Sequence, residues 1–250
     1  MPVEKKIFGL LGKDISYSFS SEYFKKKFKN LQLENHEYHN FDIQKIEDFL
    51  RILSKNKKQL KGMNVTIPYK QSIVDYLDEI DAEAIEIGAV NTIVFSKEKK
   101  LKGYNTDVYG FKKSLEPLLE IQHDKALILG TGGASKAIAF VLDKLKINFL
   151  YVSRNPKDAK EISYKNLDET KMKQCQLIIN CTPLGTFPKT EKCPDIPYQF
   201  IEETHLLYDV IYNPSITAFL EKGKQQGANI KNGLEMLQLQ AEKSWQIWNR

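Results

Sequence analysis

Residues 125–137 read KALILGTGGASKA and hold three structural signals in succession. The first is a short apolar run that is typical of a strand. Gly130, Gly132 and Gly133 follow at once, and apolar residues then recur at helical spacing through residue 144. A strand, a glycine turn and a helix in this order bring backbone N–H groups and the positive end of a helix toward a phosphate. The stretch therefore predicts a nucleotide-binding turn, with a tight turn in another kind of α/β domain as the alternative.

The next apolar run indicates which nucleotide the turn binds. Residues 147–152 (INFLYV) read as a strand that ends in Ser153, Arg154 and Asn155. A domain that binds NAD usually has an aspartate or glutamate at this point for the ribose 2′-hydroxyl, whereas an arginine suits a 2′-phosphate. The alternative is that Arg154 is a solvated surface residue. The missing acid and the position of the arginine together favour NADP as the cofactor.

The composition is that of an ordinary globular chain. Of the 250 residues, 42% are hydrophobic and 28% charged, and the net charge of +5 is spread along the chain. The lysine clusters at 25–29 and 55–61 read as solvated faces, which argues against nucleic acid as a partner. No run reaches membrane-spanning length, and the cysteines and histidines show no metal-ligand spacing. We expect no membrane, a cytoplasmic location, free thiols and no metal.

Hydrophobic patterning predicts an α/β fold. Strands alternate with helices in the second half, which indicates a parallel, doubly wound, Rossmann-like sheet. The strands expected there are 126–129, 147–152, 176–180 and 206–211, with helices at 217–227 and 234–248. In the first half we expect strands at 6–12, 37–41, 62–68, 89–95 and 101–104, a polar loop at 13–21, and helices at 22–28, 46–53, 69–77 and 83–88.

Four polar stretches lie outside the glycine turn. They are SYSFS at 16–20, NVTIPYK at 64–70, Asn91 within GAVNTI, and NTD at 105–107. Each one alone is explained by turn formation, a surface lysine or a helix cap.

Together with the glycine turn, these stretches resemble the shikimate dehydrogenase family over essentially the whole chain and in the same order. The matching motifs are GKDISYSFS, NVTIPYK, GAVNTI, NTDVYG, GTGGASKA, SRN, INCTPLG, YNPSIT and NGLEMLQLQA. The resemblance implies NADP-dependent reduction of 3-dehydroshikimate. It also implies two α/β domains, a substrate-binding domain of residues 1–106 with 233–250 and an NADP-binding domain of residues 107–232, in a monomer or a homodimer.

The resemblance also implies a role for individual residues. Lys70 and Asp107 are expected to form the catalytic pair. The expected substrate contacts are Ser18 and Ser20 for the carboxylate, with Thr66, Asn91, Tyr212 and Gln240 around the ring. The expected cofactor contacts are Gly130, Thr131, Gly132, Gly133, Ala134, Ser153, Arg154, Asn155, Thr182 and Gly233.

The residue types also fit a ketone reduction on chemical grounds. Such a reduction needs a hydride on carbon, which the cofactor supplies, and a proton on oxygen, which the protein must supply. Since no histidine falls in these stretches, Lys70 is the natural proton donor, either alone or paired with Asp107. The surrounding hydroxyls and amides suit a small acid that carries several hydroxyl groups.

The sequence departs from the family at four positions and leaves two other functions open. Tyr17, Ser21, Asn155 and Thr186 stand where the family usually has His, Pro, Thr and Met. A quinate/shikimate dehydrogenase that uses NAD is one alternative, and a catalytically silent relative that binds NADP is the other.

Overall fold

The computed structural model describes residues 4–15, 18–56, 58–96 and 100–250. The chain folds into two compact units. The first holds the chain up to Thr106 together with Gln240–Arg250, and the second is Asp107–Leu239. The C-terminal helix α8 (Leu234–Trp248) therefore contributes residues to both units, and the chain re-enters the first unit at Gln240 rather than at residue 233.

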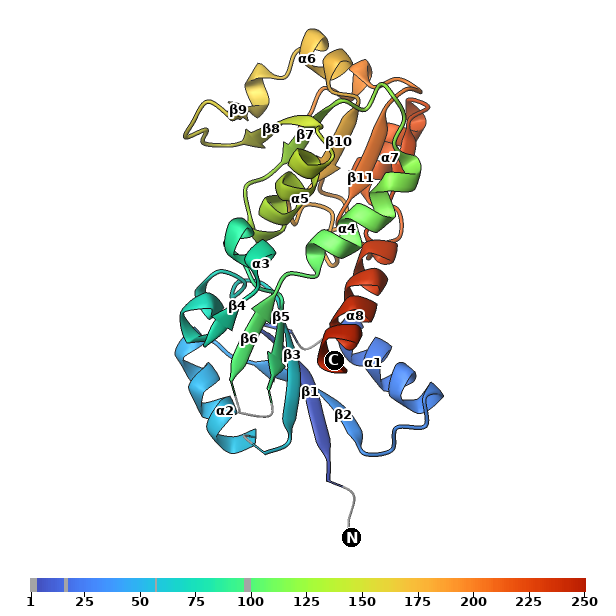
Figure 1. Cartoon of the computed structure of the whole chain (residues 1–250). Helices are drawn as coiled ribbons and strands as arrows, with labels where there is room; N and C mark the ends of the chain where they lie inside the picture. Colours follow the sequence, from blue (N-terminus) through green and yellow to red (C-terminus); the bar gives the residue numbers. More distant parts are fainter. Residues whose placement is uncertain (1–3, 16–17, 57, 97–99) are drawn as a thin grey trace. The chain divides into compact units, whose positions relative to one another are not determined.

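The first unit is built on a six-stranded mixed sheet (Figure 1). The strand order is β2-β1-β3-β5-β6-β4, in which β5 runs antiparallel to both of its neighbours. The strands are β1 (Lys6–Gly12), β2 (His36–Asp42), β3 (Leu60–Val65), β4 (Glu79–Ile80), β5 (Thr92–Phe95) and β6 (Leu101–Tyr104). The helices are α1 (Phe19–Asn30), η1 (Ile46–Asp48), α2 (Phe49–Asn56), η2 (Ser72–Tyr76) and α3 (Ala82–Ile87).

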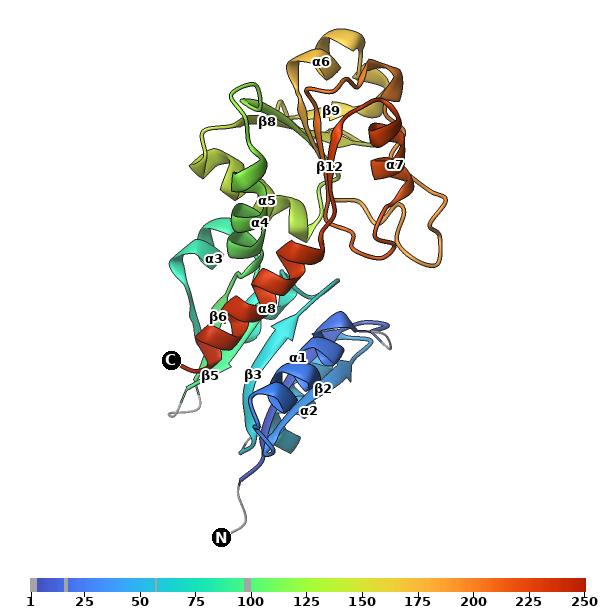
Figure 2. The ribbon, with the colours of Figure 1, turned by 90° about the vertical axis from the view of Figure 1, so that its right-hand side faces the viewer.

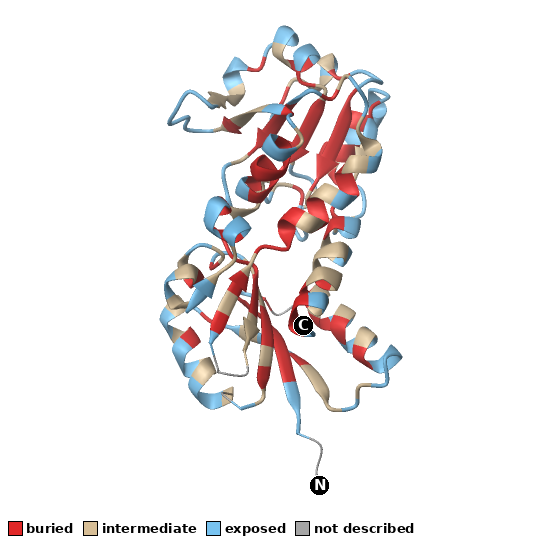
Figure 3. Cartoon of the chain, in the orientation of Figure 1, coloured by how far each residue is buried: buried red, intermediate tan, exposed pale blue. Residues whose placement is uncertain are grey.

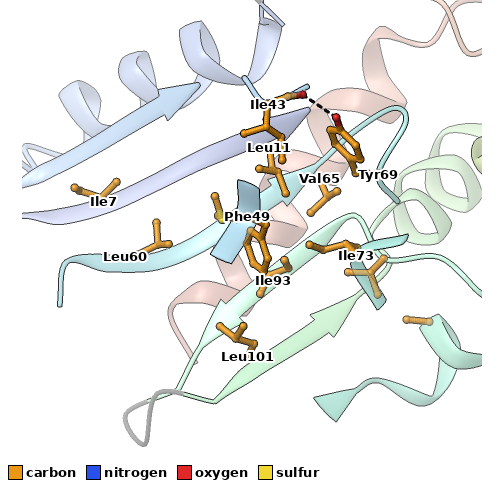
Figure 4. Packing of buried hydrophobic residues seen from close by; sticks show 13 residues of the cluster. Ile7, Leu11, Ile43, Phe49, Leu60, Val65, Tyr69, Ile73, Ile93 and Leu101 are labelled. Carbon is orange, nitrogen blue, oxygen red and sulfur yellow. Dashed lines mark hydrogen bonds between the residues drawn. The ribbon is translucent and has the colours of Figure 1, made fainter. Parts of the chain in front are cut away.

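Helices cover both faces of this sheet. On one face, residues of α2, η2 and α3 pack on Leu11, Met63 and Ile93, and the buried Tyr69 hydroxyl donates to the carbonyl of Ile43 at 2.7 Å (Figure 4). On the other face, α1 and the end of α8 pack on Phe8.

The close approach of α8 to the sheet explains a glycine in β3. The Trp248 indole N–H donates to the carbonyl of Ile93 at 2.9 Å. A Cβ at Gly62 would overlap that indole, so only glycine fits at this position.

The second unit has a six-stranded sheet in which every strand is parallel to its neighbours. The order is β12-β11-β10-β7-β8-β9, so it reverses between β7 and β10, as in dinucleotide-binding domains. The strands are β7 (Lys125–Leu129), β8 (Asn148–Ser153), β9 (Glu161–Ser163), β10 (Leu177–Asn180), β11 (Leu206–Asp209) and β12 (Asn229–Lys231). The helices are α4 (Asp107–Leu115), η3 (Glu116–Leu118), α5 (Gly133–Lys144), η4 (Tyr164–Asn166), α6 (Glu169–Gln174), η5 (Tyr198–Phe200) and α7 (Ala218–Gln225).

The central strands of the second sheet are buried almost throughout (Figure 3). Their residues are mostly apolar because helices cover both faces of the sheet. The α6–α7 face packs on Leu127, Ile178 and Leu207. On the opposite face, Phe111 of α4 stacks edge-on against Tyr208 of β11 with ring centroids 5.1 Å apart. Figure 2 shows α4 and α5 on one side of this sheet and α7 on the other. The predicted doubly wound arrangement is confirmed.

Most predicted elements are present, and two differ from expectation. Helix α1 begins at Phe19 instead of residue 22, so part of the expected polar loop is helical. The helix expected at 69–77 is only a 3-10 segment, Ser72–Tyr76, in which β-branched Ile73 and Val74 disfavour a longer α-helix. Most of the segment between the expected strands 89–95 and 101–104 lies outside the described residues.

Candidate active site

Three of the polar stretches meet at one edge of the first sheet. Strands β1, β3 and β6 all end there, because β5 runs opposite to β3 and β6. The Val65 amide donates to the carbonyl of Asn91 at 2.8 Å, and the Asn91 amide donates to the carbonyl of Tyr104 at 3.0 Å. Backbone hydrogen bonds therefore join the stretches that contain Lys70, Asn91 and Thr106.

The lysine proposed for catalysis follows β3 within this edge. Lys70 is half-buried, and its carbonyl accepts from the Val90 amide at 2.7 Å, which fixes its backbone beside the GAVNTI stretch. Asp107 is buried, opens α4 and follows Thr106 directly in the chain. Both residues make further interactions.

Asn91 is held by the residue that precedes Asp107. Its Oδ1 accepts from the Thr106 amide at 2.7 Å and from the Thr106 hydroxyl at 3.1 Å. The neighbouring Asn105 carboxamide donates to the carbonyl of Ala89 at 2.9 Å. Side chains thus add to the backbone bonds that hold the NTD stretch against GAVNTI.

The two serines predicted to bind a carboxylate lie at the start of α1. Ser18 is buried and is the N-cap, since its Oγ accepts from the Ser21 amide at 3.2 Å. Ser20 stands in the first turn and hydrogen-bonds to Tyr38, which opposes the rise in the Tyr38 pKa caused by burial. The proline usual in the family at position 21 has no N–H to donate, so this cap depends on Ser21. Tyr17 lies outside the described residues.

The remaining substrate residues predicted in the first unit are half-buried. Thr66 follows β3, and its amide donates to the carbonyl of Leu11 at 2.9 Å. Gln240 lies on α8, where its carbonyl accepts from the Ser244 hydroxyl at 2.9 Å. Glu242, two residues later, accepts from Lys27 of α1 at 2.7 Å and also from the Tyr23 hydroxyl. These bonds fix α8 beside the helix that carries Ser20.

The glycine turn follows β7, at the point where the strand order of the second sheet reverses. Gly130 has φ +98°, which favours glycine, and a Cβ there would lie 3.1 Å from the Thr182 methyl group. Gly132, the N-cap of α5, has an ordinary φ of −78°, and a Cβ there would meet no atom within 4 Å. Among the described residues, neither conformation nor packing requires glycine at 132, so the open space suits a phosphate group.

The other residues of the turn fit this description. Thr131 is exposed, and Gly133 and Ala134 begin α5 and are half-buried. Ser135, where a third glycine is usual, is fully buried and donates to the carbonyl of Gly132 at 2.7 Å.

The expected 2′-phosphate site lies at the end of β8. Arg154 is exposed, and its charge partly offsets the rise in the Tyr164 pKa that burial produces, so the two side chains are neighbours. The Ser153 hydroxyl accepts from the Asn155 amide at 3.2 Å, which shapes the turn after the strand.

A buried polar network lies at the ends of β10 and β11. Thr182 donates its hydroxyl to Asn180 Oδ1 at 2.7 Å, and the Asn180 amide donates to Asp209 at 3.1 Å. Asp209 is fully buried, and Thr217 donates to its other oxygen at 2.6 Å. Burial raises the pKa of Asp209 to about 6, although the hydrogen bonds from Thr217 and Asn180 act to lower it. Thr182 is therefore held firmly beside the glycine turn.

Two predicted residues follow β11. Tyr212 is half-buried and makes further interactions. Gly233 packs so closely on Val210 that a Cβ would overlap the Val210 carbonyl, and its amide donates to the carbonyl of Ile211 at 3.0 Å. This close packing gives Gly233 a structural reason to be glycine.

Two buried histidines of the second unit are engaged with the backbone. His123 and His205 are buried, and each accepts a backbone N–H at Nδ1 while Nε2 donates to a carbonyl. No group of three potential metal ligands occurs among the described residues. No helix in the described ranges has both the length and the apolar character required to cross a membrane.

Sequence reasoning missed three residues that surround Asn91. They are Asn64, Thr92 and Ser244: Asn64 Nδ2 donates to both hydroxyl oxygens, which lie 2.9 Å from each other. The first two lie inside quoted motifs, and Ser244 lies one helical turn after Gln240. That spacing on α8 was the available signal for Ser244.

Comparison with known proteins agrees with this geometry. Residues 10–93 match the family model described as the shikimate dehydrogenase substrate binding domain. A Clostridium botulinum protein named shikimate dehydrogenase (NADP(+)) is 39% identical over 96% of this chain and 95% of its own length. The crystal structure of shikimate dehydrogenase 1 from Peptoclostridium difficile superposes with a TM-score of 0.85 at 38% identity, covering 98% and 91% of the two chains. A Thermus thermophilus shikimate 5-dehydrogenase, solved in complex with NADP(H) and shikimate, has a TM-score of 0.84 at 29% identity, with 97% and 93% coverage.

Proposed function

Because this chain belongs to the shikimate dehydrogenase family, we propose that it interconverts 3-dehydroshikimate and shikimate with NADP as the cofactor. The reaction is a step in the synthesis of aromatic amino acids. The three cysteines are free thiols, in keeping with the reducing cytoplasm as the site of the reaction.

One observation carries the proposal. The stretches containing Lys70, Asn91 and Thr106 are far apart in the sequence but are hydrogen-bonded to one another at a single edge of the first sheet. A core alone needs no such gathering of a lysine and amides at the ends of strands, whereas a site for a small polar substrate does.

The chain's own residues supply the proton chemistry. Lys70 gives the proton to the ketone oxygen as it becomes a hydroxyl, and takes it back in the reverse direction. Asp107 is the second member of the catalytic pair. The bound cofactor would supply the hydride as NADPH, or accept it as NADP+ in the reverse direction.

Substrate recognition uses neutral polar groups around the ring. The hydroxyls of Ser18 and Ser20 bind the carboxylate, and Thr66, Asn91, Tyr212 and Gln240 bind the ring substituents. A pocket of this kind rejects analogues that leave its polar groups unpaired.

The cofactor is held mainly by backbone. The turn from Gly130 to Ala134 receives the pyrophosphate at the start of α5, where the space at Gly132 is open. Arg154, flanked by Ser153 and Asn155, would pair with the 2′-phosphate, and Thr182 and Gly233 are the remaining cofactor contacts.

A four-way assay tests the function. The purified chain is given shikimate or quinate with NADP or NAD, and reduced nicotinamide is followed by its absorbance. We expect the highest kcat/KM for shikimate with NADP. A preference for NAD and equal use of quinate would favour the broader dehydrogenase, and no turnover with any pair would identify a silent relative.

A further inference from the structure

Thr92 is the centre of a buried hydrogen-bond network in the first unit. Its side chain is fully buried at the start of β5. Four polar groups lie within hydrogen-bond distance of its Oγ1: Asn64 Nδ2 at 3.2 Å, Asn91 Oδ1 at 3.0 Å, Thr106 Oγ1 at 3.2 Å and Ser244 Oγ at 2.9 Å. We call these five residues the Thr92 network. They come from β3, from the start of β5 and the residue before it, from the segment just after β6, and from α8.

The network determines which way the Asn91 carboxamide points. A backbone N–H can only donate, so the Thr106 amide at 2.7 Å requires an oxygen at that position of Asn91. The hydroxyls of Thr92 and Thr106 donate to the same oxygen. The amide nitrogen of Asn91 therefore points the other way, and within the described residues nothing accepts a hydrogen bond from it. Asn91 thus offers a donor to an oxygen of a ligand.

The same network ties α8 to this edge of the sheet. Ser244 Oγ accepts from Asn64 Nδ2 at 2.8 Å and donates to the carbonyl of Gln240, one turn earlier, at 2.9 Å. Asn64 Oδ1 in turn accepts from the Tyr38 hydroxyl at 3.0 Å, and Tyr38 is hydrogen-bonded to Ser20. A continuous chain of neutral hydrogen bonds thus links the residues proposed to bind the carboxylate and the ring.

We propose that Thr92 and Ser244 are positioning residues for substrate binding, which keep the Asn91 amide turned as a donor and hold Gln240 in register with it. This inference rests on the proposed function. Neither residue is assigned a contact with the substrate, and both act through Asn91 and Gln240. Because the network is buried and nearly saturated, loss of one hydroxyl leaves its partners unpaired and frees the carboxamide to rotate.

The test compares two substitutions at one position. Thr92→Val keeps the shape of the side chain and removes the hydroxyl, whereas Thr92→Ser keeps the hydroxyl. For Thr92→Val we expect KM for shikimate, and the dissociation constant for shikimate measured by calorimetry without cofactor, to rise about 10-fold. KM for NADP should stay within about twofold, and Thr92→Ser should restore shikimate binding.

Ser244→Ala supplies an independent variant if Thr92→Val folds poorly. It should weaken shikimate binding by a similar factor. Because the two hydroxyls act in one network, the double variant should lose little more than the worse single variant.

Ser114→Ala is the matched control for a lost buried hydroxyl. Ser114 is buried in the second unit and lies 2.6 Å from the Tyr208 hydroxyl. This variant should lower the melting temperature without changing shikimate affinity. If Thr92→Val and Ser244→Ala behave like Ser114→Ala, the network is structural and the inference is wrong. Failure of the proposed function would differ, because the unsubstituted chain would then neither oxidise nor bind shikimate.

Discussion

The two strand edges that carry the candidate residues are built in opposite ways. At the edge of the first sheet, side chains fill the space and bond to one another, as the four partners of Thr92 show. At the edge of the second sheet, the turn after β7 leaves open space beside its backbone. No atom of the described residues lies within 4 Å of the position that a Cβ at Gly132 would take. The first arrangement suits a small ligand read by oriented donors and acceptors. The second suits a phosphate that must approach the backbone closely.

The glycines of the second unit also differ in whether the fold itself requires them. Gly130 is required by its positive φ and Gly233 by its packing on Val210, so both are explained within the chain. Gly132 has neither a positive φ nor a close neighbour among the described residues. A glycine that the fold does not need is the stronger indication of a ligand.

The largest effect is expected at Lys70, the residue at the first edge to which we assign the chemistry. Lys70→Ala should lower kcat about 10²–10⁴-fold, because the ketone oxygen loses its proton donor. The dissociation constant for shikimate should change only a few fold. Lys61→Ala, at the opposite end of β3, is the control and should leave kcat unchanged. Unaltered turnover in Lys70→Ala would remove this lysine from the mechanism.

The next prediction tests whether the turn after β7 binds phosphate. Gly132→Asp places a carboxylate in the open space, so KM for NADP should rise about 100-fold through repulsion and lost contacts. Its melting temperature should hardly change, because φ is ordinary there and no atom is displaced.

Gly130→Ala is the matched comparison within the same turn. Its φ of +98° is strained for alanine, so this variant should lose stability by about 1–3 kcal/mol. Equal losses of stability in both variants would show that Gly132 is also a structural glycine.

How much the sequence predicts differs between the two edges for a physical reason. The glycine turn is contiguous, and the flanking apolar runs identify its strand and helix, so the topology around it was predictable. The Thr92 network draws on residues from 64 to 244, and no local pattern relates them. Tertiary contacts decide such networks, and a single sequence does not display those contacts.

Short elements were missed for a related reason. Strands β9 and β12 have three residues each, too few to show a periodicity, and they form because neighbouring strands offer free edges. The early start of α1 depends on the Ser18 cap, which a polar run of serines conceals.

A smaller effect is expected at Arg154, the side chain at the second edge that we propose binds the 2′-phosphate. Arg154→Ala should raise KM for NADPH about 10-fold and leave KM for NADH unchanged, because only NADPH carries the 2′-phosphate. Lys157→Ala, an exposed cation three residues later, is the control for general charge. Equal changes for the two cofactors would contradict the assignment of Arg154.

The smallest effect concerns the free energy of unfolding. It should depend on pH through the network around Asp209 but not through the Thr92 network. The Thr92 network has no titratable member, whereas Asp209 is buried with its pKa raised to about 6 from an ordinary value of 3.8. Between these values the folded chain holds a proton that the unfolded chain has released, so stability falls as pH rises through about 6. From pH 5 to 7.5 the loss from this group is about 1 kcal/mol.

Asp209→Asn should abolish that part of the pH dependence while keeping the hydrogen bonds with Thr217 and Asn180. Denaturant unfolding at the two pH values measures it, with the exposed Asp124→Asn as the control. A slope in Asp209→Asn equal to that of the unsubstituted chain would mean that Asp209 does not hold its proton in this range. The network around Asp209 would then be as insensitive to pH as the Thr92 network, because the Asp209 carboxylate would already be charged throughout.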